Sequence, residues 1–323
     1  MDVDVYVVVV VVDPGPDRRG WRRSRGRAKG GRAVIGQPQF EIVEPRSGES
    51  PVLVEVPHAG LFLDAESLAW SQAPARSIAA DADLHVDDIF HESPSEGATL
   101  IHACSSRYVV DLNRGLGDCD GEAVEGGGRT PWPRGLVWRL TTDGAPALVS
   151  RLPRYELERR LELVYRPYHA AVERLLARKR SRFGYAVLLC AHSMPSHGRG
   201  RTQAGSDARA RADVVPGTRG RTTAAGPLID IVDRTASETG FSVRHDEPYR
   251  GGFSTGHYGK PDHNIHAIQV EIARRLYMDE SSLRLSHAGF ETVREFARTL
   301  VSRLADGGAR HAAVSGEANA GRT

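Results

Sequence analysis

The sequence has 323 residues, 40% of them hydrophobic, which suffices for one large α/β domain or two small domains with a buried core. Its formal net charge of +2 is close to balance, so the overall charge gives no reason to expect a nucleic-acid partner. The longest apolar run, residues 5–12, falls far short of the roughly 20 residues of a membrane-spanning helix, and two preceding aspartates make it a poor signal peptide.

The two ends of the chain differ in composition from its middle. Residues 1–36 join a valine run to a segment rich in glycine and arginine that has little to bury. We expect a disordered leader or the product of a start site placed too far upstream, with a basic arm for nucleic acid or a membrane surface as the alternative. Residues 305–323 are small and polar and are predicted to be a disordered tail, so the folded domain is residues 37–304.

Between these ends, predicted strands and helices alternate along the chain. Continuous apolar runs predict strands at 52–56, 98–103, 108–112, 185–189 and 266–272. Apolar spacings of three and four predict helices over 154–179, 227–239 and 290–304. Pro167 should kink the first of these helices. The alternation favours a single α/β domain with a mixed, mostly parallel sheet covered by helices on both faces.

Two long segments, 115–129 and 197–221, are rich in glycine and polar residues. Each follows a segment with candidate site residues, so we interpret both as substrate loops. The three cysteines, Cys104, Cys119 and Cys190, are odd in number and widely spaced, which argues against a disulfide framework or a zinc knuckle. A reducing, cytoplasmic setting fits this pattern best.

His58 and His192 each follow an apolar run that is predicted to be a buried strand. In open α/β sheets the ligand crevice lies beyond the carboxyl ends of the strands. Neutral imidazole is the commonest metal ligand, and a catalytic zinc takes three protein ligands. We therefore expect the two histidines to share a metal, with a carboxylate from Asp83, Asp87 or Asp88 as the third ligand.

Two further segments carry candidate catalytic residues. Asn113 and Arg114 end the "VVDLNR" run, and a planar guanidinium there suits bidentate binding of a substrate carboxylate. Glu271 lies in the apolar run "HAIQVEIA", where a carboxylate is costly to bury unless it is paired or functional. Desolvation would raise its pKa, which suits a general base, and a buried ion pair is the alternative.

Seven motifs in fixed order give these residues a context. They are "VPHAG", "DADLHVDDIF", "SRYVVDLNR", "YRPYH", "FGYAVLLCAHS", "YRGGFSTGHYG" and "HAIQVEIARRLYMDE". With them the chain, from about residue 40 to 304, resembles the N-formylglutamate amidohydrolase family of zinc carboxypeptidase-like hydrolases. The resemblance implies that fold, zinc as the cofactor, and a place in histidine degradation.

The resemblance also implies roles for individual residues. Zinc would be bound by His58, Asp83 and His192, and Glu271 would act as general base and acid. The substrate-side residues implied are the carboxylate-binding pair Asn113 and Arg114, the oxyanion-stabilising Arg107, and Arg250 and His257. The activity implied is hydrolysis of N-formyl-L-glutamate to formate and L-glutamate, with this small molecule as the partner.

The chain departs from the family pattern at two positions. Cys190 stands where the family usually has the aspartate of "DAHS". Because Cys190 is two residues from His192, it should share a strand face with that ligand, and an aspartate there could orient it, so Cys190→Asp should tighten zinc. Gly256 stands where related sequences carry an arginine, which leaves open a deacylase of another N-acyl amino acid or a carboxypeptidase-like peptidase. A non-catalytic paralogue that binds a metal or ligand is the remaining alternative.

Overall fold

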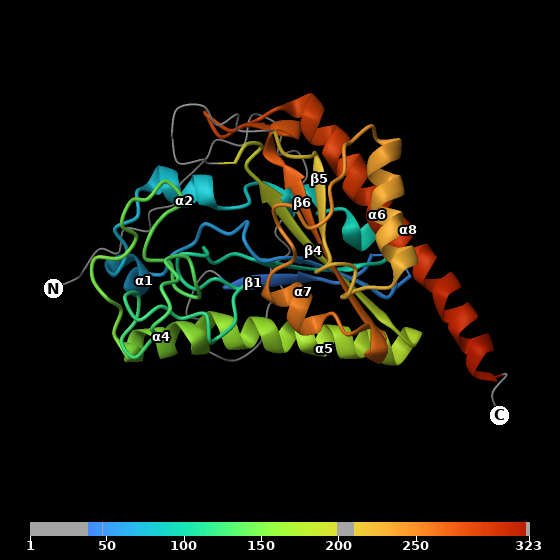
Figure 1. Cartoon of the computed structure of the whole chain (residues 1–323), viewed down its shortest axis with the longest axis horizontal. Helices are drawn as coiled ribbons and strands as arrows, with labels where there is room; N and C mark the ends of the chain where they lie inside the picture. Colours follow the sequence, from blue (N-terminus) through green and yellow to red (C-terminus); the bar gives the residue numbers. More distant parts are fainter. Residues whose placement is uncertain (1–37, 47, 199–209, 321–323) are drawn as a thin grey trace, which may run out of the picture.

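A six-stranded mixed sheet forms the centre of the protein (Figure 1). The computed structural model describes residues 38–46, 48–198 and 210–320, with side chains described as far as residue 307. The predicted leader, residues 1–36, therefore lies outside the described residues, as does part of the loop 197–221. The sheet strands are β1 (Phe40–Val43), β2 (Val52–Val56), β3 (Thr99–Ala103), β4 (Ala186–Met194), β5 (Val214–Gly217) and β6 (Ile265–Ala273).

The order of the strands is β1-β3-β2-β4-β6-β5. The four central strands run parallel, and the edge strands β1 and β5 are antiparallel to their neighbours. The prediction of a mixed, mostly parallel sheet is confirmed. Both edge strands were missed, because each has only four residues.

Helices cover both faces of the sheet, as predicted (Figure 1). One face packs against α4 (Arg154–Arg160) and α5 (Arg166–Phe183), and the other against α6 (Gly226–Glu238) and α8 (His287–Ala320). Alternate residues of β2 divide between the two cores, with Val54 on the α6 and α8 side and Leu53 on the α5 side. Burial on both faces explains why the central strands read as continuous apolar runs.

Shorter elements lie around this framework. They are α1 (Ala65–Ala69), α2 (Ala75–Asp81), α3 (Val86–Ile89), η1 (Ser93–Glu96), the π-helical η2 (Leu161–Tyr165), α7 (Phe253–Tyr258), η3 (Pro261–His263), η4 (Arg274–Leu276), β7 (Met278–Asp279) and β8 (Arg284–Leu285).

Three predicted elements differ from the structure. Residues 108–112 form a buried irregular segment, not a strand. Val109 and Leu112 pack into the core with α5, and this burial explains the apolar run that resembled a strand. The helix predicted over 154–179 is interrupted by the π-helical segment η2, which comes just before Pro167. Residues 305–320, predicted to be a disordered tail, continue α8 as far as Ala320, and alanine is the strongest helix former.

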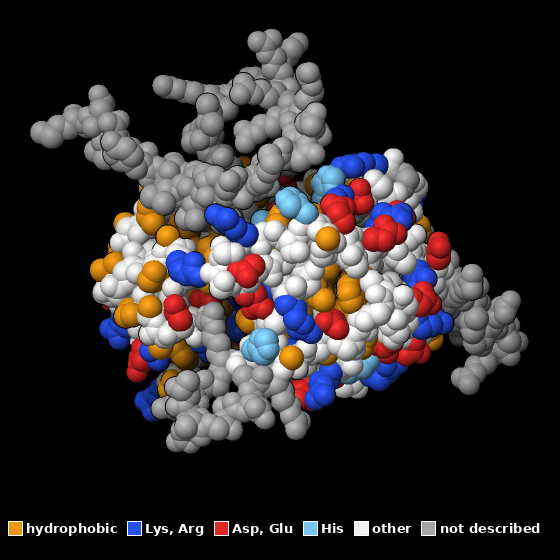
Figure 2. All heavy atoms as spheres, turned by 90° about the horizontal axis from the view of Figure 1, so that it is seen from above, with side chains coloured by type: hydrophobic (Ala, Val, Ile, Leu, Met, Phe, Trp, Pro, Cys, Tyr) orange, Lys and Arg blue, Asp and Glu red, His pale blue; other side chains and the backbone are white. Residues whose placement is uncertain are grey.

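The surface shown in Figure 2 carries acidic and basic side chains interspersed with one another. That face therefore presents no extended field of a single sign, in keeping with the small net charge of +2. Among the described residues, no helix combines the length and the apolar character needed to cross a membrane.

Candidate metal centre and active site

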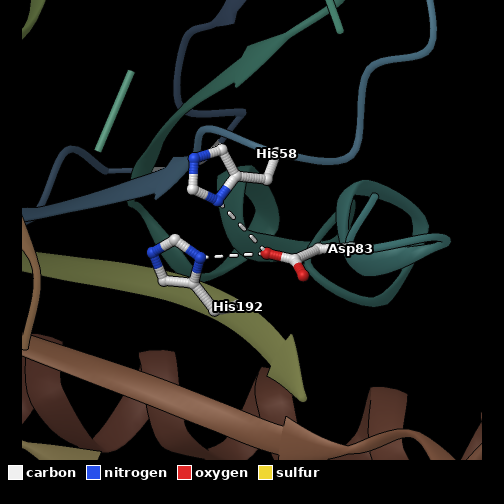
Figure 3. A group of neighbouring side chains, drawn as sticks. All are labelled: His58, Asp83 and His192. Carbon is white, nitrogen blue, oxygen red and sulfur yellow. Dashed lines mark hydrogen bonds and ion pairs between the residues drawn. The ribbon is translucent and has the colours of Figure 1, made fainter. Parts of the chain in front are cut away.

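Three buried side chains from distant parts of the chain meet at the carboxyl end of the parallel strands (Figure 3). Nδ1 of His192 lies 2.9 Å from Oδ2 of Asp83, and Nδ1 of His58 lies 3.6 Å from the same oxygen. One donor atom from each of the three residues lies within 4.8 Å of the others. Two imidazoles and a carboxylate around an enclosed point form a set that can hold a metal ion.

The local folds that present these donors are all short and constrained. His58 follows β2 directly after Pro57. Asp83 lies in the link between α2 and α3, where its backbone N–H donates to the carbonyl of His58 at 3.0 Å. His192 was predicted to follow its strand, but β4 continues to Met194, so the imidazole projects from within the strand.

The second nitrogen of His58 shows why this group fits a cation. Nε2 of His58 lies 2.8 Å from Oδ1 of Asp111, which can only accept, so the imidazole donates from Nε2. A neutral ring then presents a lone pair at Nδ1, which faces the Asp83 carboxylate oxygen. Two acceptors facing each other in a buried site are reconciled by a positive charge between them, and a carboxylate behind a metal-binding histidine is a common arrangement.

Each of the two buried aspartates, Asp111 and Asp83, contacts an arginine through the oxygen that does not face a histidine. Oδ2 of Asp111 accepts from Nη2 of Arg107 at 2.8 Å and from the indole N–H of Trp138 at 3.0 Å. Oδ1 of Asp83 lies 3.3 Å from Nη2 of Arg274, which leaves Oδ2 directed at the histidines. Burial alone would raise the pKa of Asp111, but the nearby Arg107 and His58 hold it well below its usual range.

Glu271 lies beside His192, because these two residues are paired in the register of β4 and β6. Its side chain is buried, and Oε1 accepts from Nε2 of Gln269 at 2.8 Å. Burial raises the pKa of Glu271 to about 7, although the nearby His192 opposes this shift. A carboxyl group that exchanges its proton near neutrality can act as both base and acid.

Asn113 connects the metal group to helix α7. Its Nδ2 lies 3.2 Å from Nε2 of His192, and its Oδ1 accepts from the backbone N–H of Ser254 at 3.0 Å. A β-carbon at Gly252 would collide with the Asn113 amide, so only glycine fits there. The N–H of Gly252 donates to Oε1 of Gln269 at 2.8 Å, which ties the start of α7 to the strand of Glu271.

The predicted substrate-side residues lie at different distances from this network of contacts. Arg107 reaches it through Asp111, and its guanidinium also lies over the Trp138 ring. Arg114 is partly buried, and its guanidinium donates only to backbone carbonyl groups of the described residues. Arg250 is exposed. The ring of His257 stacks on Phe253 and its Nε2 lies 3.9 Å from Glu173 of α5, so the structure does not bring it to the metal group.

Cys190 shares a sheet face with His192, as expected, but its sulfur has other neighbours. Sγ lies 3.7 Å from Oγ1 of Thr255, and Cys190 is paired with the buried Glu55 in the register of β2 and β4. Oε1 of Glu55 accepts from Ser254 at 2.9 Å, and its Oε2 has no hydrogen-bond partner among the described residues. The structure therefore gives the ring of His192 a contact with Asn113 and places the thiol below α7.

Sequence reasoning missed Asp111, Glu55 and Arg274. Asp111 and Glu55 each stand in an apolar run, and the argument from the cost of burial that selected Glu271 applies equally to them. Arg274 gave no signal, because an arginine after a strand is ordinarily on the surface. Asp87 and Asp88, the alternative ligands, lie on α3 and are not part of the metal group.

The comparisons with known proteins agree on one family. The family model described as N-formylglutamate amidohydrolase matches residues 50–278. The N-formylglutamate deformylases of Pseudomonas putida and Pseudomonas aeruginosa are 33% and 32% identical, over 75% and 81% of this chain and 86% and 97% of their own. The crystal structure of N-formylglutamate amidohydrolase from Ralstonia eutropha superposes with a TM-score of 0.75 at 31% identity, covering 84% of this chain and 98% of that one.

The contact between Asp111 and His58 predicts a measurable effect on metal affinity. Asp111→Asn removes the charge that orients the imidazole and should weaken binding of a divalent metal about tenfold or more. Competition with a chelator measures this affinity. The control is Asp120→Asn, since Asp120 is also buried and paired with an arginine, Arg139, but has no contact with the metal group. Equal affinities in the two variants would contradict the role given to Asp111.

The surroundings of Cys190 predict that Cys190→Asp destabilises the fold, in place of the tighter zinc binding expected from the sequence. The substitution would put a second carboxylate beside Glu55, whose pKa is already raised by burial. We expect it to lower the free energy of unfolding by roughly 3 kcal/mol, the scale of an uncompensated buried charge. Urea denaturation measures this loss, with Cys190→Ser as the control that keeps a small neutral side chain. Tighter metal binding without loss of stability would instead support the earlier expectation.

Proposed function

The chain belongs to the N-formylglutamate amidohydrolase family, and on that premise we propose that it hydrolyses N-formyl-L-glutamate to formate and L-glutamate. The observation that carries this proposal is the position of Glu271 on the strand beside His192, next to a buried set of metal donors. A base and a metal site on adjacent strands are the parts that metal-assisted hydrolysis of an amide requires.

We propose zinc as the metal, held by His58, Asp83 and His192. Two histidines and one carboxylate are a common donor set of catalytic zinc, which leaves a position open. The chemistry that zinc supplies in such a site is polarisation of the scissile carbonyl and activation of a water molecule.

In this proposal Glu271 takes a proton from the attacking water and delivers it to the leaving amine. Its pKa of about 7 supports both transfers, because neither protonation state is strongly disfavoured near neutrality. Gln269, which donates to Oε1, orients the carboxyl group.

The substrate carboxylate is assigned to Arg114 and Asn113. Arg114 has no carboxylate partner among the described residues, so its charge is available to a substrate carboxylate. Arg107 is proposed to stabilise negative charge on the carbonyl oxygen, from the place where Asp111 and Trp138 fix it. Arg250 and His257 remain predicted substrate contacts.

A panel of substrates tests the proposed function. Formate release from N-formyl-L-glutamate should exceed hydrolysis of the N-acetyl and N-succinyl analogues, because the site is proposed to hold a small acyl group. The alternative is a deacylase of another N-acyl amino acid, because Gly256 stands where related sequences carry an arginine. A faster reaction with another acyl group would establish that alternative, and no turnover by metal-loaded protein would establish a non-catalytic paralogue.

The role of Glu271 gives a separate prediction. Glu271→Gln should keep the fold and the metal but lower kcat by about a hundredfold or more, the scale of general acid–base catalysis. His192→Ala should lose metal and activity together, so metal analysis beside kinetics distinguishes the two roles. Glu41→Gln, on the edge strand β1, is the control and should leave kcat unchanged. If Glu271→Gln stayed within a few-fold of the wild type, another group must be the base.

A further inference from the structure

Arg219 has a backbone conformation that side chains rarely adopt. Its φ is +53°, in the left-handed region that is unfavourable for residues other than glycine. The backbone N–H groups of Thr218, Arg219 and Gly220 donate to the Asp246 carboxylate at 2.8, 3.0 and 2.7 Å. A strained residue held by three hydrogen bonds at its turn is a reason to ask what its side chain does.

The guanidinium of Arg219 lies directly against the α-carbon of Gly256 in helix α7. A β-carbon at position 256 would collide with Nη1 of Arg219 and would lie 2.8 Å from its Cζ. Any side chain at this position must therefore displace the guanidinium. The observed position of the guanidinium therefore requires a residue without a side chain at position 256.

Arg219 differs from its neighbours in its charge partners. Arg221, in the same loop, pairs with Asp230 at 2.6 Å, and Arg244 pairs with Glu247 at 3.1 Å. For Arg219, no carboxylate of the described residues lies within ion-pair distance of the guanidinium, and the residue is exposed. It therefore presents an unneutralised charge to solvent beside Gly256.

This charge is connected to the active site through one turn of helix. The N–H of Gly256 donates to the carbonyl of Gly252 at 3.1 Å, and four residues of helix correspond to a rise of about 6 Å. Gly252 in turn contacts Asn113 and Gln269, the neighbours of His192 and Glu271. The loop of Arg219 is also joined to Arg250, whose carbonyl accepts from the Arg219 N–H at 2.8 Å.

We propose that Arg219, with its guanidinium in the space that Gly256 leaves open, is a specificity-determining residue that binds the side-chain carboxylate of a dicarboxylic N-acyl amino acid. This inference rests on the proposed function and goes beyond it, because it assigns the second carboxylate of the substrate to a named residue. A guanidinium without a carboxylate partner can bind a carboxylate through two parallel hydrogen bonds.

Kinetics with a matched pair of substrates test the proposal. Arg219→Ala should raise KM for N-formyl-L-glutamate about tenfold or more, with kcat changed less than KM. For N-formyl-L-glutamine, which lacks the side-chain charge, kcat/KM should stay within about twofold. Arg219→Lys keeps the charge without the fork and should fall between Arg219→Ala and the wild type. Arg221→Ala removes the same charge from the same loop and should leave the preference for glutamate unchanged.

Gly256→Ala provides an independent test that leaves Arg219 in the chain. Alanine is favourable in a helix, so the substitution acts by displacing the guanidinium rather than by disrupting α7. It should reproduce the KM effect of Arg219→Ala, and the double variant should show no further loss, as expected for two residues that act at one point. Equal losses for both substrates, or additive losses in the double variant, would show that Arg219 only supports the packing of α7 and would overturn the proposal.

Direct binding distinguishes failure of this inference from failure of the proposed function. Glutarate, which carries two carboxylates and no scissile bond, is titrated by calorimetry into the metal-loaded wild type and Arg219→Ala. If the wild type released no formate while glutarate bound tenfold more weakly to the variant, the proposed reaction would be wrong and the carboxylate site right. If formate were released normally and the wild type and the variant bound glutarate equally, the proposed reaction would be right and the carboxylate site wrong.

Discussion

The burial of the Asp83 carboxylate between two imidazoles is the constraint around which the site is built. One oxygen faces Nδ1 of both histidines, and the other contacts Arg274. Because a charged group is costly to remove from water, each of these contacts must be satisfied for the fold to keep Asp83 inside. The link between α2 and α3 is thereby fastened to β2, β4 and the residue that follows β6, so the metal donors and the sheet take their positions together.

The polar contacts behind the donors continue this arrangement outward. His58 is supported by Asp111, and Asp111 by Arg107 and Trp138, while His192 is neighboured by Asn113. These contacts fix the orientation of both rings, and for His58 the contact with Asp111 leaves the lone pair at Nδ1, on the side of Asp83. Asn113 connects the buried histidines to helix α7, because the same side chain contacts His192 and the backbone N–H of Ser254.

Much of the fold could be predicted from the sequence, since strands buried on both faces and a long amphipathic helix leave clear patterns. His58, Asp83 and His192 were predicted to meet, and the structure brings them together. The segment 108–112 was mistaken for a strand, because an apolar run reports burial and not backbone conformation. The contacts of Asp111, Glu55 and Arg219 could not be predicted, because they depend on which loops the tertiary structure places side by side. An aspartate at position 190 was expected to orient His192, and only the register of β2 and β4 shows that the pairing partner of Cys190 is Glu55.

Helix α7 has six residues, and apart from Tyr258, which joins the apolar core on the α5 side, its buried side chains are polar. Its polar inward side chains meet the buried carboxyl of Glu55 and the thiol of Cys190, and burial raises the pKa of both groups, which favours their neutral forms. Hydrogen bonds of this kind contribute less net free energy than apolar packing, and a helix this short has little stability alone. The segment can therefore open by local unfolding while the central strands stay protected from hydrogen exchange. Binding of a substrate that contacts this segment would close it, so part of the binding free energy would appear as slower amide exchange in α7.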